Sequence, residues 1–112
     1  MEKADPQDFY RLDIRTGTIV EAFEFPEAKK PAYKLTIDFG KEVGLKKTSA
    51  QITDLYKPAE LIGKQIVAVV NFPAKQIGKY MSECLVLGAV ASGGEVNLLV
   101  TDKQSENGEK IG

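Results

Sequence analysis

The stretch QIVAVVNFPAKQIGKYMSECLVL, from Gln65 to Leu87, gives the first indication of the fold. It contains two strongly apolar runs, QIVAVVN and ECLVL, separated by the polar segment FPAKQIGKYMS. Short apolar runs bounded by turn-forming residues are typical of buried strands. A connection that only reverses the chain needs about two to five residues, and this one is longer. We therefore expect two strands joined by a loop that carries a function, the alternative being a tolerated surface loop.

This loop combines chemical groups that rarely serve one structural purpose. Aromatic, amide, hydroxyl and ammonium side chains occur together in it: Asn71, Phe72, Lys75, Gln76, Lys79, Tyr80, Met81 and Ser82. Such a mixture suits stacking on a base or an apolar side chain while also binding a phosphate or a backbone amide.

Upstream, alternating apolar and polar residues predict three strands, over Ile14–Phe25, Ala32–Phe39 and Leu45–Ile52. Gly17, in the middle of the first strand, indicates a bulge or a sharp bend. We expect a hairpin turn over Gly40–Gly44 between the second and third strands.

Two short helices are expected, one over Asp5–Tyr10 with Asp as its N-cap, and one over Pro58–Ile62, ended by a glycine. Ile66–Asn71 and Glu83–Leu87 are read as the fourth and fifth strands, and Val96–Val100 as a last strand.

The order of three strands, a short helix and two or more strands is that of the OB-fold, a five-stranded Greek-key barrel. An SH3-like barrel is the competing all-β fold, but it lacks a helix at that place. With 112 residues, the chain supports one small domain. We expect the barrel over residues 13–100, an N-terminal helical extension over residues 1–12, and a polar, frayed C-terminal arm over residues 101–112.

Charge is distributed unevenly along a chain whose formal net charge is −1. Residues 1–27 contain seven acids against three basic residues, a net of −4, whereas residues 28–80 contain ten lysines against four acids, a net of +6. The basic middle would form one electropositive face unless folding intermixes the two parts.

Several kinds of chemistry are excluded by composition. The chain has no histidine and one cysteine, Cys84, so it lacks Ser-His-Asp and Cys-His catalytic systems and zinc sites built from His or Cys. It has no phosphate-binding or dinucleotide-binding glycine motif. A binding module without cofactor or metal is expected, not an enzyme. The N-terminus has no apolar signal core and no apolar run is long enough for membrane insertion, which predicts a cytoplasmic protein.

Five separated segments resemble a known family: DIRTGTIVE (13–21), PEAK (26–29), SAQI (49–52), VAVVNFP (67–73) and MSECLVLG (81–88). They are similar to the tRNA-binding OB-fold domain found at the C-terminus of some methionyl-tRNA synthetases, in the endothelial monocyte-activating polypeptide and in free-standing dimers. Within that family, KPAYKLTIDFG (30–40), SAQIT (49–53) and AVVNFP (68–73) resemble the CsaA-type chaperones of protein export. The resemblance covers residues 9–100.

The resemblance implies a homodimer joined through its terminal segments, which places dimer contacts at Phe9, Leu12, Val96 and Leu98. It also implies a ligand site on the loop between strands four and five and on the third strand: Lys46, Lys47, Ser49, Gln51, Asn71, Lys75, Gln76 and Ser82. Phe72, Tyr80 and Met81 join this set as stacking or apolar groups.

Two ligands follow from these residues. Where tRNA-binding relatives commonly have Asn-Leu-Lys-Pro-Arg-Lys, this chain has Asn-Phe-Pro-Ala-Lys-Gln, with one basic residue instead of three. That difference favours unfolded or presecretory polypeptide as the ligand, with the translocation ATPase SecA as a possible partner. The alternative is tRNA or other structured RNA, bound through lysines and by stacking on Phe72 or Tyr80.

Overall fold

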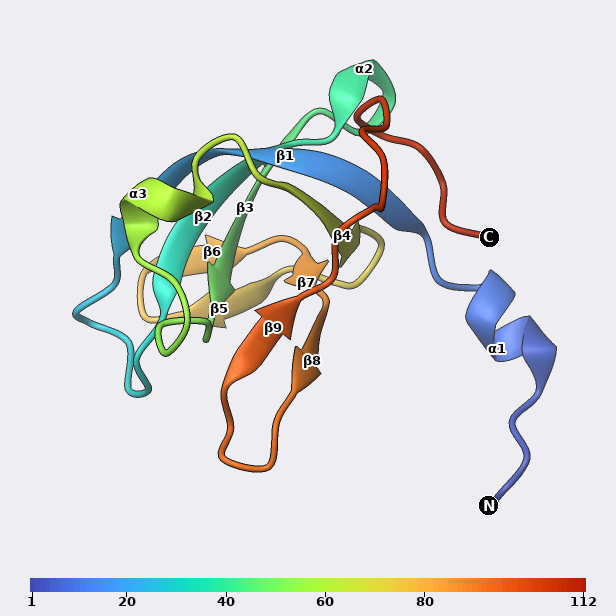
Figure 1. Cartoon of the computed structure of the whole chain (residues 1–112), viewed down its shortest axis with the longest axis horizontal. Helices are drawn as coiled ribbons and strands as arrows, with labels where there is room; N and C mark the ends of the chain where they lie inside the picture. The colour runs from blue at the N-terminus through green and yellow to red at the C-terminus, as the bar shows by residue number, and fades with distance from the viewer.

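The computed structural model describes residues 1–112 and is built mainly of antiparallel strands (Figure 1). The main sheet contains β1 (Ile14–Glu24), β2 (Tyr33–Asp38), β3 (Leu45–Ala50), β4 (Gln65–Val69) and β7 (Leu85–Val86), in the order β3-β2-β1-β4-β7. Two hairpins accompany it, β5 (Lys75–Ile77) with β6 (Tyr80–Ser82) and β8 (Gly88–Val90) with β9 (Val96–Leu98). The helices are α1 (Pro6–Tyr10), α2 (Gly40–Val43) and α3 (Pro58–Leu61).

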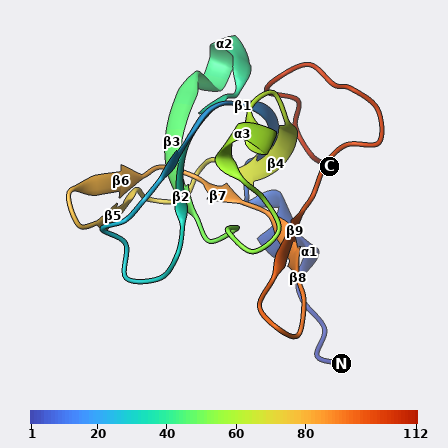
Figure 2. The ribbon, with the colours of Figure 1, turned by 60° about the vertical axis from the view of Figure 1, so that its left-hand side comes forward.

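The sheet curls into a nearly closed barrel, and α3 lies between β3 and β4 in the chain, as predicted. This confirms the all-β class and the OB-fold architecture. The β5–β6 hairpin extends from one side of the barrel, and the C-terminal segment covers the opposite side (Figures 1 and 2). Helix α1 projects away from the barrel and has no buried residue.

Strand β1 is the longest strand and bends over the barrel because of one extra residue. Its pairing with β2 shifts register between Ile19 and Glu21, which leaves Val20 as the bulged residue. Ile19 and Ala22 are therefore both buried, although simple alternation would place them on opposite faces. The predicted bulge at Gly17 was wrong in position, because pairing with β4 is continuous through Gly17.

Gly17 instead serves the packing of the barrel interior. A Cβ atom at this position would lie 2.6 Å from the Phe39 ring, and Phe39 is fully buried. Any side chain here would displace a large core residue.

Strand β4 is buried on both faces, which explains its nearly continuous apolar sequence. Ile66 and Ala68 join the main core with residues of β1, β2 and β3. Val67 and Val69 point the other way and form a small cluster with Ile14, against which Leu12, Leu87 and Ile111 pack. The second cluster requires a cover over β1 and β4 that a bare barrel would lack.

The C-terminal segment provides that cover, so the prediction that it is frayed was wrong. The Thr16 N–H donates to the Glu109 carbonyl at 3.0 Å, and the N–H groups of Gly108 and Ile111 donate to the Thr16 and Ile14 carbonyls. The Thr16 hydroxyl donates to the Glu106 carbonyl at 2.7 Å. Ile111 covers the apolar outer face of β4, and the polar composition of the segment gave no sign of this.

Three further boundaries differ from the predictions. The predicted turn over Gly40–Gly44 is the short helix α2, and the predicted loop between the fourth and fifth strands contains the β5–β6 hairpin. The predicted strand over Glu83–Leu87 is reduced to β7, after which the chain enters β8. The extent of β7 depends on its pairing with the distant strand β4, which local periodicity does not reveal, whereas α2 and the β5–β6 hairpin are formed by contacts within a few residues.

Candidate binding site

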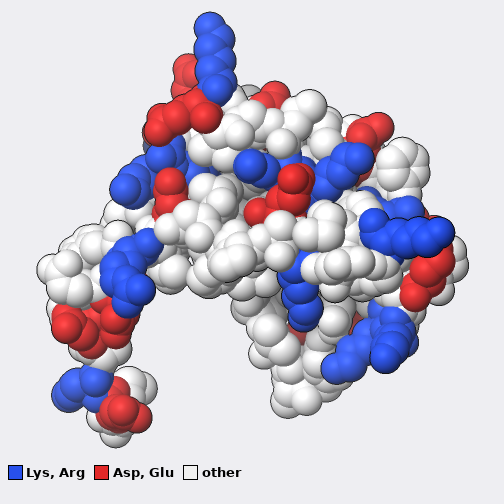
Figure 3. Space-filling model, turned by 180° about the vertical axis from the view of Figure 1, so that it is seen from behind, with Lys and Arg blue, Asp and Glu red and all other residues white.

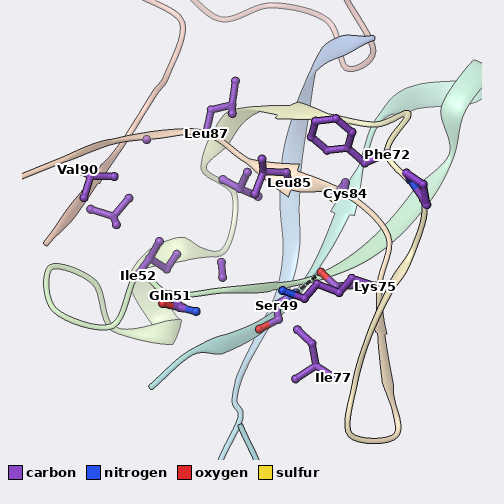
Figure 4. Close-up of a pocket in the computed structure, with 16 residues that line it drawn as sticks. Ser49, Gln51, Ile52, Phe72, Lys75, Ile77, Cys84, Leu85, Leu87 and Val90 are labelled. Atoms are coloured by element: carbon purple, nitrogen blue, oxygen red, sulfur yellow. Dashed lines mark hydrogen bonds between the residues drawn. The ribbon is translucent and has the colours of Figure 1, made fainter. Parts of the chain in front are cut away.

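A cavity of about 540 Å³ opens between the edge of β3 and the segment that carries β7 and β8. Ten of its sixteen lining residues are hydrophobic. Figure 4 shows Phe72, Leu85 and Leu87 on one side of the cavity and Ser49, Gln51 and Ile77 on the other. We call this cavity the β3–β7 pocket. Mostly apolar walls with a few polar groups are typical of ligand sites.

The side of the pocket formed by β3 is held in place by an unusual closure of the barrel. The Glu83 N–H donates to the Lys47 carbonyl at 2.7 Å, and the Lys47 N–H donates to Glu83 Oε1 at 2.8 Å. The Ser49 N–H donates to Ser82 Oγ at 3.0 Å. Side chains thus replace part of a main-chain ladder, and the barrel is left open beyond Ser49.

The opposite side of the pocket carries large apolar side chains that remain in contact with solvent. Phe72 is 44% exposed, Leu85 is 49% exposed and Val90 is 71% exposed. Full burial of such a side chain is worth roughly 1.5–3 kcal/mol, and these residues forgo part of that free energy. Exposed apolar groups that gather in one place mark interaction sites. This side of the pocket can receive an apolar ligand without rearranging the core.

Cys84 is a buried residue in the wall of the pocket. Burial raises the pKa of its thiol to about 11. The Thr48 hydroxyl donates to the Cys84 carbonyl at 2.7 Å and holds this part of the wall against β3. At neutral pH the thiol is protonated and acts as a small apolar group.

Lys75 is the only charged residue that lines the pocket. Lys46 and Lys47 lie on β3, and Lys79 lies in the turn of the β5–β6 hairpin, which packs near β3. On the face seen in Figure 3, basic and acidic side chains are interspersed. That face gives no support to a single electropositive surface.

The pocket brings together some of the ligand-binding residues expected from the sequence. Ser49, Gln51, Phe72, Lys75 and Ser82 line it. The others are outside its lining: Lys46, Lys47, Asn71, Gln76, Tyr80 and Met81.

Asn71 and Tyr80 make contacts with distant parts of the chain. The Asn71 side chain accepts from the Asp13 N–H at 2.8 Å and donates to the Arg11 carbonyl at 2.9 Å. The Tyr80 hydroxyl donates toward the Thr48 carbonyl at 3.2 Å, and its ring packs edge-on against Phe25. Burial raises the pKa of Tyr80 to about 12. Both side chains therefore fasten loops to the barrel.

The residues expected at a dimer contact fall into different environments. Leu98 is 6% exposed and belongs to the main core, so its side chain offers no contact surface. Val96 lines the β3–β7 pocket, and Leu12 packs against the small cluster on β4. Phe9 is 40% exposed on the projecting helix α1. Tyr10 beside it is more exposed still.

The sequence analysis missed Ile52, Leu85 and Leu87, which it assigned to apolar strands, and Val90, which it assigned to no element, as pocket residues. The available signal was the unbroken apolar run CLVL (84–87), which does not alternate as a strand with one solvent face would. No group of three or more His, Cys, Asp or Glu side chains is placed to hold a metal ion. No helix is long and apolar enough to cross a membrane.

Comparisons with known proteins agree with this architecture. Residues 14–110 match the family model described as "Putative tRNA binding domain". The structure of chaperone CsaA from Bacillus anthracis str. Ames is similar, with 52% sequence identity and a TM-score of 0.94, over 99% of this chain and 100% of that one. A CsaA chaperone protein from Picrophilus torridus has 54% identity and a TM-score of 0.92, over 98% and 100% of the chains.

Among curated proteins, a methionine–tRNA ligase from Methanocaldococcus jannaschii is 37% identical over 99% of this chain, which spans only 17% of that enzyme. The similarity therefore concerns a domain of the enzyme and not its whole length. The chain belongs to the tRNA-binding domain family and is, along its whole length, a relative of the CsaA chaperones.

Proposed function

We propose that the protein is a non-enzymatic, CsaA-type binding protein that holds unfolded or presecretory polypeptide in the β3–β7 pocket. The observation that carries this proposal is the apolar lining of the pocket, with Phe72, Leu85 and Val90 still exposed to solvent. An unfolded segment offers the apolar side chains that such a surface can bury. The whole-length similarity to proteins named as CsaA chaperones supports the same function.

The decisive experiment compares the binding of an unfolded precursor protein and of tRNA over a series of salt concentrations. Burial of apolar groups is little affected by moderate salt, so precursor binding should persist between about 50 and about 200 mM salt, whereas phosphate contacts weaken steeply. Precursor binding that falls as steeply as tRNA binding would contradict the proposal.

A pair of variants makes this experiment specific to the pocket. Phe72→Ser removes an exposed aromatic group from the pocket wall and should weaken precursor binding about tenfold or more. Met81→Ser is the matched control, because Met81 is 45% exposed but lies outside the pocket lining. Equal effects of the two substitutions would place the ligand elsewhere.

Binding of tRNA is the second candidate function, favoured by the family model and by the lysines beside the pocket. With phosphate contacts from Lys46, Lys47, Lys75 and Lys79, the log-log salt slope should be about −3 to −4. Lys75→Ala should reduce that slope by about one, whereas Lys103→Ala, on the C-terminal segment, should leave it unchanged. A slope near zero would exclude this candidate.

The proposal includes a homodimer, in which the exposed aromatic residues of α1 contact a second copy. Two pockets on one particle would raise avidity for a long ligand by a factor of roughly 10²–10⁴ if their spacing fits. A role in protein export, with the ATPase SecA as a partner and the cytoplasm as the compartment, rests on the resemblance to CsaA-type chaperones.

A further inference from the structure

The main-chain hydrogen bonding along the edge of β3 changes where this edge reaches the pocket. The N–H and C=O of Lys47, which point away from β2, are bound by Glu83, and the Ser49 N–H is bound by Ser82. Two residues further along the same edge, directly after the end of β3, the N–H and C=O of Gln51 have no hydrogen-bond partner in the chain. Gln51 lines the pocket and is exposed. An unpaired strand edge of this kind is a template for pairing with another main chain.

The groups around this edge select the chemistry of the partner. A main-chain donor and acceptor on one residue match the alternating N–H and C=O groups of an extended polypeptide, in which every second residue faces the edge. Beyond the edge, Phe72, Leu85 and Leu87 form an apolar wall for side chains that alternate along such a strand. A nucleic-acid backbone has no N–H and C=O pair to complete a ladder.

The charge of the pocket further restricts which polypeptide segments can bind. Lys75 is the one charged group of the pocket lining, and no acidic residue lines the pocket beside it. A carboxylate on the bound segment would meet a favourable potential there, and an ammonium group would be repelled.

We infer that the polypeptide ligand binds by adding a strand to the edge of β3 at Gln51, with apolar side chains in the β3–β7 pocket and a carboxylate near Lys75. This inference deepens the proposed function and rests on it. It assigns a recognition mode, β-strand addition, in which main-chain hydrogen bonds supply affinity and alternate side chains supply specificity.

The main test replaces single amide hydrogens of the ligand by methyl groups. The probe is a short end-blocked peptide that alternates valine or phenylalanine with serine and carries one glutamate, and its affinity is measured by titration calorimetry. Each peptide bond is N-methylated in turn. Methylation at residues that pair with Gln51 should weaken binding about tenfold or more, and methylation at the residues between them should have a much smaller effect.

A protein variant tests the same hydrogen bonds from the other side. Gln51→Pro removes the free N–H donor without removing a hydrogen bond that the folded chain makes. Gln51→Ala keeps the donor and is the matched control. Peptide affinity should be about tenfold lower in Gln51→Pro than in Gln51→Ala, because the two variants lose the same side chain and only the proline variant loses the N–H donor. If Gln51→Pro unfolds at a lower temperature, the methylation series on the unaltered protein decides alone.

A third experiment tests the role of charge by reversing the charge at position 75 and on the peptide. Lys75→Glu should weaken the glutamate peptide and strengthen an otherwise identical lysine peptide, whereas Lys103→Glu should change neither. No peptide binding at all would overturn both the proposed function and this inference. Peptide binding with a flat methylation series would overturn only the strand-addition mode. Displacement of the peptide by a single-stranded oligouridine that loses affinity in Gln51→Pro would assign the edge to RNA instead.

Discussion

Ser82 Oγ lies 3.0 Å from the main-chain nitrogen of Ser49 and accepts its hydrogen bond, in a place where an adjoining strand would supply a carbonyl oxygen. The same oxygen lies 3.0 Å from the Thr48 hydroxyl. One small side chain therefore fastens β6 to the edge of β3 and limits how far the barrel opens toward the pocket.

Replacement of Ser82 by alanine should destabilise the protein, because the Ser49 N–H loses its acceptor. We expect the free energy of unfolding to fall by about 1–2 kcal/mol, measured by urea denaturation. Ser92→Ala, in an exposed turn, is the control and should change the free energy of unfolding by less than about 0.5 kcal/mol. An equal loss in both variants would mean that the Ser82 contact does not hold the barrel together.

Stability should also fall at alkaline pH because of Cys84. Its thiol has a pKa of about 11 in the folded protein and an ordinary value of 9.0. Between these values the unfolded chain loses the proton and the folded chain retains it, so unfolding becomes easier as the pH rises from 9 to 11. The slope should be at most about 1.4 kcal/mol per pH unit from this group.

Comparison with Cys84→Ala isolates the effect of the thiol. The raised pKa of Tyr80 also lowers stability at alkaline pH, but it does so in both proteins and therefore cancels. The free energy of unfolding of each protein is measured by urea denaturation. The value for the parent minus the value for Cys84→Ala should decrease from pH 9 to pH 11. A difference that stays constant with pH would show that the thiol titrates normally.

Arg15 should hold the C-terminal segment against the barrel. Its guanidinium donates to Asp13 at 2.6 Å and to the Gly108 carbonyl at 3.0 Å. Arg15→Ala should lower the free energy of unfolding by about 1–3 kcal/mol and speed hydrogen exchange at the amide of Gly108. Arg11→Ala, with an exposed side chain, is the control and should leave that exchange rate unaltered.

The same ion pair predicts an acid dependence. Hydrogen bonding to Arg15 holds the pKa of Asp13 below its ordinary value of 3.8. The contribution of Asp13 to stability is therefore present above pH 3.8 and is lost as the pH falls further, toward its folded pKa. Arg15→Ala should remove this part of the acid dependence, which a urea series at acidic pH would detect.

We expect helix α1 to be stable only when it packs against a second copy of the chain. It has five residues, none of them buried, and a helix of that length is not stable by itself in water. Phe9→Ser with Tyr10→Ser should shift the protein from dimer to monomer in sedimentation experiments. Deletion of residues 1–12 should do the same, and a deleted chain that still sediments as a dimer would contradict this role.

Part of the candidate site could be found from composition, because the connection after β4 is unusually long and chemically mixed, and part of it followed only from the family resemblance. Phe72, Lys75 and Ser82 belong to that connection, whereas Ser49 on β3 and Gln51 directly after β3 were expected from the resemblance. Leu85, Leu87 and Val90 could not be found in this way, since an apolar strand residue has the same local pattern whether it faces a core or a groove.

Local sequence by itself determined the first three strands, the short helix between β3 and β4, the apolar strand β4, and the polar connection that carries Phe72 and Lys75. Alternation, proline and glycine act over a few residues, so they can be read without a partner strand. Only the tertiary structure decided that Ser82 and Glu83 close the edge of β3, that Gln51 stays free, and that the polar C-terminal segment covers β4. Each of these results depends on contacts between segments that are distant in the sequence. Strand register and side-chain burial are set by the neighbouring segment that packs against each strand, and local sequence does not specify that neighbour.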